Sequence, residues 1–239
     1  MTTLTTPPRL DGRMLVSRLI GGLFLAGFLT YGTGNALVNS VASGEDLLVS
    51  VAAHATVLTL GAFLMLLNTA VDIGKAILFF PVVEQHGRRT ALAYLAAMII
   101  QVILMAVGAL AVLMLIPLAR ETAAAGDVAD GWAAALGSLA LDANALGYQA
   151  GQLALAVGAF VLVALLYRTR LVPRPLAGLG LLGYVAHAAG AAAELFGVPI
   201  SLVLLIPGGL FEIGLAGWLL VRGFDPGAYE GPREQAAVA

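Results

Sequence analysis

The stretch ALAYLAAMIIQVILMAVGALAVLMLIPL, residues 91–118, contains no charged side chain. Since a helix rises about 1.5 Å per residue, about 20 apolar residues cross the ~30 Å hydrocarbon layer of a bilayer. The stretch therefore predicts a transmembrane helix. The whole chain agrees, because 60% of its residues are hydrophobic and only 11% are charged, whereas about a quarter are charged in soluble domains. The sequence is that of an integral membrane protein.

Further apolar stretches lie on both sides of this one and are separated by polar or Gly- and Pro-rich breaks. They cover residues 14–38, 48–83, 135–167, 175–196 and 199–222. The sequence thus predicts an all-α polytopic protein with a six-helix transmembrane bundle over residues 14–222. Residues 1–13 form a short N-terminal segment, and the polar tail 223–239 is expected to be disordered. The 48–83 stretch exceeds one crossing, so it must tilt, project from the bilayer or begin with an interfacial turn near residues 44–50.

The arginines orient this bundle. If six spans alternate across the membrane, Arg120 falls on one side and the other arginines fall on the opposite side: Arg9, Arg13, Arg18, Arg88, Arg89, Arg168, Arg170, Arg174, Arg222 and Arg233. Basic residues accumulate in short cytoplasmic segments. We therefore expect a multi-pass protein of the inner (plasma) membrane with both termini in the cytoplasm.

Three polar side chains interrupt the 48–83 stretch. Asn68, Asp72 and Lys75, the only lysine of the chain, follow the spacing i, i+4, i+7, which places them on one face of a helix. A charged side chain at the centre of a membrane helix costs about 2.5–3.5 kcal/mol, and such residues face the bundle interior in pairs. The spacing predicts that Lys75 pairs with a carboxylate inside the bundle.

Other polar residues fall at a similar depth on neighbouring helices. Counted from the arginines that end their spans, Glu212, Gln101 and His187 lie about 15–20 Å into the membrane. One lysine and two carboxylates leave an excess negative charge in this layer. Asn68, Asp72, Lys75, Gln101, His187 and Glu212 are therefore candidates for binding a ligand or a proton. The alternative is that the charges serve only as contacts between helices.

A second polar stripe is predicted on the span 135–167. Asp142, Gln149 and Gln152 are spaced i, i+7, i+10 and share roughly one face in the external half of the span. They either line an outer vestibule or bond to neighbouring helices. In the last span Pro207 lacks the N–H that would bond to the Val203 carbonyl, so a kink or a break is expected just before Glu212.

Several classes of function find no support in the residues. The chain has no cysteine, which removes thiolate catalysis, iron–sulfur clusters and cysteine zinc sites. Its three histidines fall at different depths and do not form a haem pair, and no metal site or cofactor is predicted. No hydrolase or phosphate-loop motif occurs, and a net charge of −2 gives no argument for nucleic acid. The expected partners are the lipid bilayer, a small-molecule ligand or proton, and, for the alternative of a structural contact, another membrane protein.

Three stretches resemble a known family. They are VDIGKAILFFPVVEQHGRR (71–89), LLYRTRLVPRPLAGLGLLGYV (165–185) and PGGLFEIGLAGWLLVRGF (207–224). They are similar to the bacterial membrane family of domain of unknown function 4386, over nearly the whole chain. The resemblance implies a multi-helix membrane domain without assigned activity, and Asp72 and Glu212 match its positions. Lys75 departs from it, since an apolar or small residue is expected there.

Two functions follow from these observations. The first is a transporter-type bundle that binds a ligand or a proton through Asp72, Lys75 and Glu212. The second is a structural or accessory subunit that binds a partner protein and uses the charged residues only as interhelical contacts. The two differ in one structural feature, because a binding site borders a water-filled cavity and a purely structural contact is dry.

Overall fold

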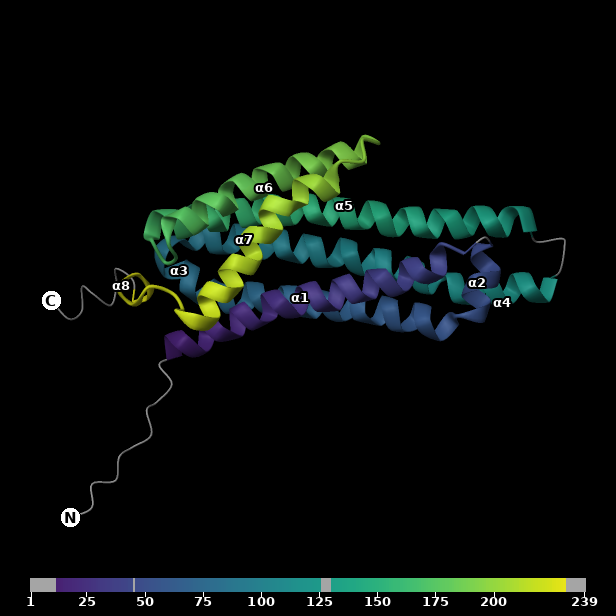
Figure 1. Ribbon diagram of the computed structural model, residues 1–239, viewed down its shortest axis with the longest axis horizontal. Coiled ribbons are helices and arrows are strands. Elements are labelled where there is room, and N and C mark those ends of the chain that lie inside the picture. Colours follow the sequence, from purple (N-terminus) through teal and green to yellow (C-terminus); the bar gives the residue numbers. More distant parts are fainter. Residues whose placement is uncertain (1–11, 45, 126–129, 231–239) are drawn as a thin grey trace, which may run out of the picture.

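The computed structural model describes residues 12–44, 46–125 and 130–230. Within these ranges the chain is helical and contains no strand (Figure 1). The helices are α1 (Gly12–Ala42), α2 (Leu47–Ala53), α3 (Ala55–Leu113), α4 (Leu115–Ala125), α5 (Asp130–Thr169), α6 (Arg174–Leu195), α7 (Ser201–Val221) and α8 (Pro226–Tyr229). The predicted all-helical membrane bundle is confirmed.

Helix α3 is folded back on itself. At Gly87 the backbone angles are φ −174° and ψ 92°, which are not helical. Gln101 and Asp72 are 29 residues apart and would lie about 44 Å apart in a straight helix, yet their side chains are 3.1 Å apart. Residues 55–86 and 88–113 are therefore two antiparallel arms. Five helical segments of the described chain are long and apolar enough to span a membrane, and the one that contains α3 consists of two antiparallel arms, which is compatible with the predicted six-helix bundle.

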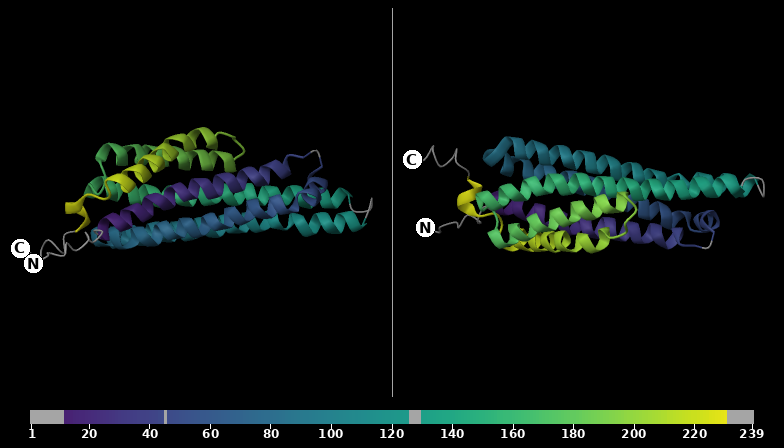
Figure 2. Two further views of the ribbon diagram at one scale, coloured as in Figure 1. Left: turned by 60° about the horizontal axis from the view of Figure 1, so that its bottom comes forward. Right: turned by 90° about the horizontal axis from the view of Figure 1, so that it is seen from above.

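The helices form a long bundle with a shorter hairpin on one face. Helices α1, α3 and α5 run lengthwise, and the α6–α7 hairpin covers one side of them over part of their length (Figures 1 and 2). We call the two ends of the bundle the α8 end, where α1 begins and α7 finishes, and the α2 end, where α2 and α4 lie. Helix α7 crosses α1 near the α8 end and diverges from it toward the α2 end.

Side chains on the outside of the bundle are apolar. Leu29, Leu182 and Leu202 are each at least 70% exposed, which suits contact with lipid tails and not with water. Small residues allow the helices to pack closely inside. A Cβ on Gly34 would lie 2.7 Å from the carbonyl oxygen of Gly61, so α1 and α3 approach backbone to backbone at this crossing.

Helix α7 remains continuous through Pro207. A break before Glu212, which the sequence left open, is therefore not present. Instead, the segment at Pro207 packs against α6, because a Cβ on Gly183 would lie 2.7 Å from the backbone of Gly208. The Pro207–Gly208 segment of α7 thus packs closely against Gly183 of α6.

At the α2 end, a short helix and not a simple loop connects α1 to α3. The interfacial turn expected near residues 44–50 takes the form of the short helix α2, whose N-cap Asp46 accepts a hydrogen bond from the Val49 amide at 3.1 Å. After α2 the chain changes direction at His54 and enters α3. The long 48–83 stretch is thereby divided into an interfacial helix and one membrane arm.

The expectation of a disordered tail is wrong for residues 223–230. Phe224 is fully buried; its amide donates to Ser17 Oγ at 3.1 Å, and Arg13 donates to its carbonyl. Gln85 donates to the Tyr229 carbonyl at 2.7 Å. The aromatic ring of Phe224 supplies apolar area that fixes this segment against the bundle. Residues 231–239 lie outside the described part of the chain.

The buried core consists of two apolar clusters with polar residues between them. One cluster, toward the α8 end, includes Phe79 and Phe211; the other, toward the α2 end, includes Leu58 and Val112. On the first arm of α3 the segment from Asn68 to Lys75 separates the two clusters. The buried side chains of this polar layer are Asn68, Asp72, Lys75, Gln101, Gln152 and His187.

Candidate functional site

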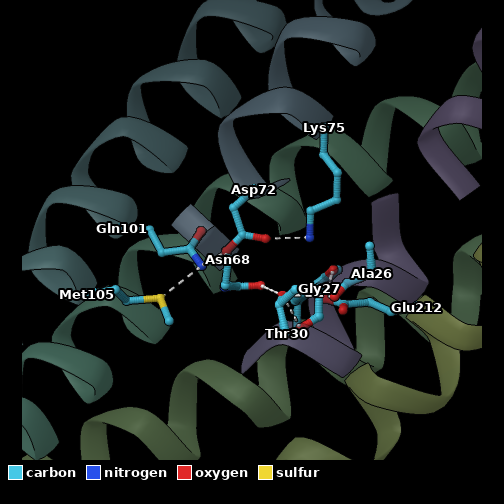
Figure 3. A network of polar contacts seen from close by, with 10 residues as sticks. Ala26, Gly27, Thr30, Asn68, Asp72, Lys75, Gln101, Met105 and Glu212 are labelled. Carbon is cyan, nitrogen blue, oxygen red and sulfur yellow. Dashed lines mark hydrogen bonds and ion pairs between the residues drawn. The ribbon is translucent and has the colours of Figure 1, made fainter. Parts of the chain in front are cut away.

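Asp72 is the centre of the polar layer. Its Oδ1 forms an ion pair with Lys75 Nζ at 2.7 Å, and its Oδ2 accepts from Asn68 Nδ2 at 3.0 Å and from Gln101 Nε2 at 3.1 Å (Figure 3). The predicted i, i+4, i+7 face therefore points inward, and the predicted ion pair of Lys75 is present. The donors come from both arms of α3, so the Asp72 carboxylate is fully engaged and also joins the two arms.

Helix α1 closes this network on a second side. Lys75 is only 7% exposed, and its Nζ lies 4.6 Å from the centre of the Phe24 ring, where the ring face attracts the ammonium group. Thr30 Oγ1 donates to Asn68 Oδ1 at 3.2 Å. Gly27 of α1 faces this network, since a Cβ there would lie in ordinary contact with Asn68 Oδ1, at 3.4 Å.

Glu212 enters the layer from α7 and is held differently from Asp72. Its Oε1 accepts a hydrogen bond from the Tyr184 hydroxyl of α6 at 2.7 Å. In the described part of the chain, the ion pair of Lys75 within 4.0 Å is with Asp72 and not with Glu212. Lys75 thus neutralises Asp72, and among the described residues Glu212 has no basic partner within 4.0 Å.

A cavity of about 180 Å³ borders these side chains. Asp72, Lys75, Glu212, Gln101 and His187 are among the residues that line it, so the predicted candidates of the polar layer meet around one space. Gln101 Oε1 is buried and has no hydrogen-bond partner among the described residues. An unsatisfied buried acceptor costs about 1–3 kcal/mol.

A second and larger cavity, of about 470 Å³, lies next to the first toward the α2 end. The predicted stripe of Asp142, Gln149 and Gln152 lines it, and we call it the vestibule. The two cavities have lining residues in common, which are Tyr31, Tyr148, Gln152, His187 and Leu205. They adjoin each other along these residues.

Two tyrosines stand at the junction of the cavities. The rings of Tyr31 on α1 and Tyr148 on α5 are stacked, with their centres 5.1 Å apart and their planes at 14°. Both rings line both cavities. A molecule that moves from the vestibule to the polar layer passes beside this aromatic pair.

The short α6–α7 hairpin determines where the vestibule opens. Gln149 donates to Ser201 Oγ at 3.2 Å, which fixes the first residue of α7 beside the middle of α5. From Gln149 to Thr169 helix α5 covers about 30 Å, one hydrocarbon thickness. Asp142 lies about 10 Å further along α5, beyond the part that the hairpin covers, and is exposed, so the vestibule is open to the outside of the bundle beside Asp142.

Several lining residues were not identified from the sequence. Tyr31, Asn35 and Asn39 all line the vestibule and follow the spacing i, i+4, i+8. The helical spacing that identified Asn68 and Asp72 could therefore also have identified this polar face of α1. Tyr148 adjoins Gln149, which was identified. Tyr184 offered no such pattern, because its contact with Glu212 depends on how α6 and α7 pack.

Comparison with known proteins gives one match. The family model described as "Domain of unknown function (DUF4386)" matches residues 19–223. That range includes the whole polar layer and the vestibule. No curated protein matches the chain, and no solved structure matches it.

Proposed function

Since the chain belongs to the family of domain of unknown function 4386, which carries no stated activity, we propose its function from its own site. The protein is a transporter-type membrane protein that binds a proton or a small ligand in the polar layer and exchanges it through the vestibule. Asp72, Lys75 and Glu212 are the charged groups of the binding site. Asn68, Gln101 and His187 complete its polar lining.

One observation supports this proposal more than any other. The polar layer borders a cavity that adjoins a second one (Figure 3 shows the cluster), whereas residues that only joined helices would be packed on all sides like the two apolar clusters. A cavity of this size that is bordered by several polar side chains has room for water with hydrogen-bond partners. Ionisable groups inside a membrane that face such a space are typical of ion and substrate pathways.

The two carboxylates have different roles in this proposal. Asp72 accepts two hydrogen bonds and an ion pair, so it holds Lys75 and the arms of α3 in place. In the described part of the chain Glu212 accepts one side-chain hydrogen bond, from the Tyr184 hydroxyl, and in this proposal it carries the excess negative charge. A proton or a small cation that enters the cavity neutralises that charge, and Glu212 is therefore the exchanging group.

The arginines support an orientation for this exchange. Arg13, Arg18, Arg88, Arg170 and Arg222 lie in the segments that meet at the α8 end, and Arg120 lies in α4 near the α2 end. By the distribution of basic residues in membrane proteins, the α8 end faces the cytoplasm. The vestibule then opens to the outside of the inner membrane.

The proposal is tested with matched carboxamide variants. Glu212→Gln keeps an acceptor for Tyr184 but removes the charge, and Glu84→Gln removes the half-exposed carboxylate that pairs with Arg88 at 3.6 Å on the surface. In proteoliposomes with a trapped pH dye, we expect the wild type and Glu84→Gln to carry a pH-dependent proton or cation flux and Glu212→Gln to lose it. Infrared spectra of the same samples should show a pH-dependent carboxyl band that Glu212→Gln lacks.

Thermal unfolding decides between this function and the structural alternative. We expect Glu212→Gln to unfold near the wild-type temperature, since its hydrogen bond with Tyr184 persists. A large fall in unfolding temperature, with flux and carboxyl band unchanged, would favour an accessory subunit in which Glu212 is only an interhelical contact.

A further inference from the structure

A third cavity, of about 630 Å³, lies at the α8 end, away from the polar layer. Its walls come from the α5–α6 turn, the last turn of α7 and the segment before α8. The charged residues that line it are Arg170, Arg174, Arg222 and Asp225, and Trp218 is also part of its wall. Three guanidinium groups and one carboxylate give it a net positive charge.

The backbone around this cavity is firmly positioned. The Asp225 amide donates to the Leu171 carbonyl at 2.9 Å, which ties the end of α7 to the α5–α6 turn. Leu171 and Val172 are buried. Arg170 has a left-handed backbone with φ 59°, a conformation that is rare for residues other than glycine. The turn thus holds the arginine at a fixed position on the rim of the cavity.

The guanidinium groups are available to a ligand. Arg170, Arg174 and Arg222 are exposed, and none of them forms an ion pair within 4.0 Å with another described residue. Arg174 lies over the Tyr167 ring at 5.4 Å, a contact that orients the group without using its N–H donors. Asp225 directs one carboxylate oxygen to the Ala228 amide at 3.0 Å, so it is engaged in capping α8.

The cavity also sits at the level of lipid head groups. Val221 is 71% exposed, as a side chain against lipid tails is, and Arg222 of the cavity wall follows it directly. Trp218 belongs to the residue type that is enriched at the membrane–water boundary. Basic pockets between membrane helices at this level suit anionic head groups.

We propose that this cavity binds the phosphate of an anionic lipid head group through Arg170, Arg174 and Arg222. A guanidinium group donates paired hydrogen bonds to phosphate oxygens, and three such groups around one space can surround the phosphate. The site does not depend on the function proposed for the polar layer, because the two share no lining residue.

The test compares two double variants with the same change of charge. Arg170→Gln/Arg222→Gln removes two groups of the cavity, and Arg88→Gln/Arg89→Gln removes two exposed arginines at the same end but outside it. The full chain in neutral detergent is titrated with short-chain phosphatidylglycerol, short-chain phosphatidylcholine or inorganic phosphate. Binding is followed by the unfolding temperature and by tryptophan fluorescence, to which Trp218 in the cavity wall contributes.

We expect phosphatidylglycerol to bind the wild type and the Arg88/Arg89 variant equally, and to bind the Arg170/Arg222 variant at least about tenfold more weakly. Equal weakening in both variants, or equal binding of phosphatidylcholine, would overturn the proposal. Binding of inorganic phosphate without phosphatidylglycerol would show a free anion as the ligand and would also overturn it. If the double variant does not fold, the single change Arg174→Gln is measured by the same criteria.

Discussion

At the residue scale, the Asp72 carboxylate binds Lys75 on its own helical arm and Gln101 on the other, and so holds the two arms of α3 together. The spacing of Asn68, Asp72 and Lys75 was sufficient to place them on one inward face, because an isolated charge in lipid is too costly. For Gln101, on the other arm, the sequence predicted only that it lies at about the same depth in the membrane as Asp72. It did not predict the hydrogen bond between the two side chains. The sequence did not show whether Lys75 pairs with Asp72 or with Glu212, since that depends on the side-chain geometry between α3 and α7.

The ion pair predicts a non-additive effect on stability. Lys75→Met leaves the buried Asp72 carboxylate without its counter-ion, so we expect a loss of about 3–5 kcal/mol in unfolding free energy. The double variant Asp72→Asn/Lys75→Met buries no charge and should lose clearly less than the sum of the single changes. Reversible unfolding in detergent measures all three. Additive losses would show that Asp72 and Lys75 are not coupled.

At the element scale, the sequence predicted the breaks that carry turn residues and missed those that do not. The reversal of the chain at Gly87 lies in the polar break between the predicted spans 48–83 and 91–118. The change of direction at His54 lies in apolar surroundings and separates α2 from α3. There α2 and α4 pack side by side, and this tertiary contact, which has no local signal, decides where the helices end.

The close crossing of α1 and α3 gives a prediction with a matched control. At Gly34 an added Cβ would lie 2.7 Å from the Gly61 carbonyl oxygen, whereas at Gly22 of the same helix it meets nothing within 4 Å. We expect Gly34→Ala to cost about 1–3 kcal/mol of unfolding free energy through overpacking. Gly22→Ala should be neutral or stabilise by up to about 1 kcal/mol, because alanine favours the helix. If both variants unfold alike, the two helices do not approach this closely.

At the scale of the whole molecule, helix length produces the vestibule. Helix α5 has 40 residues, while α6 has 22 and α7 has 21, so the hairpin cannot cover all of α5. The sequence indicated that the last two spans are shorter than the span 135–167. It did not indicate which face of α5 they cover. Asp142 and Gln149 line a cavity because they lie on a face of α5 that the hairpin does not fully cover. The absence of cysteine from the chain makes this cavity open to a direct chemical test.

The central claim is that water reaches the charged cluster from the vestibule, and the reactivity of Gly27→Cys tests it most directly. A Cβ at this position would lie 3.7 Å from Lys75 Nζ and 3.8 Å from Asp72 Oδ1, so the thiol faces the cluster. Ile213→Cys, next to Glu212 but 52% exposed on the apolar outside, is the control.

Both variants are treated with a small water-soluble thiosulfonate in right-side-out and inverted membrane vesicles, and the rate of labelling is measured. Because the thiolate forms only where water is present, we expect Gly27→Cys to react, faster in right-side-out vesicles, while Ile213→Cys stays unlabelled. A folded Gly27→Cys protein that reacts no faster than Ile213→Cys from either side would contradict the account, since the cluster would then be dry.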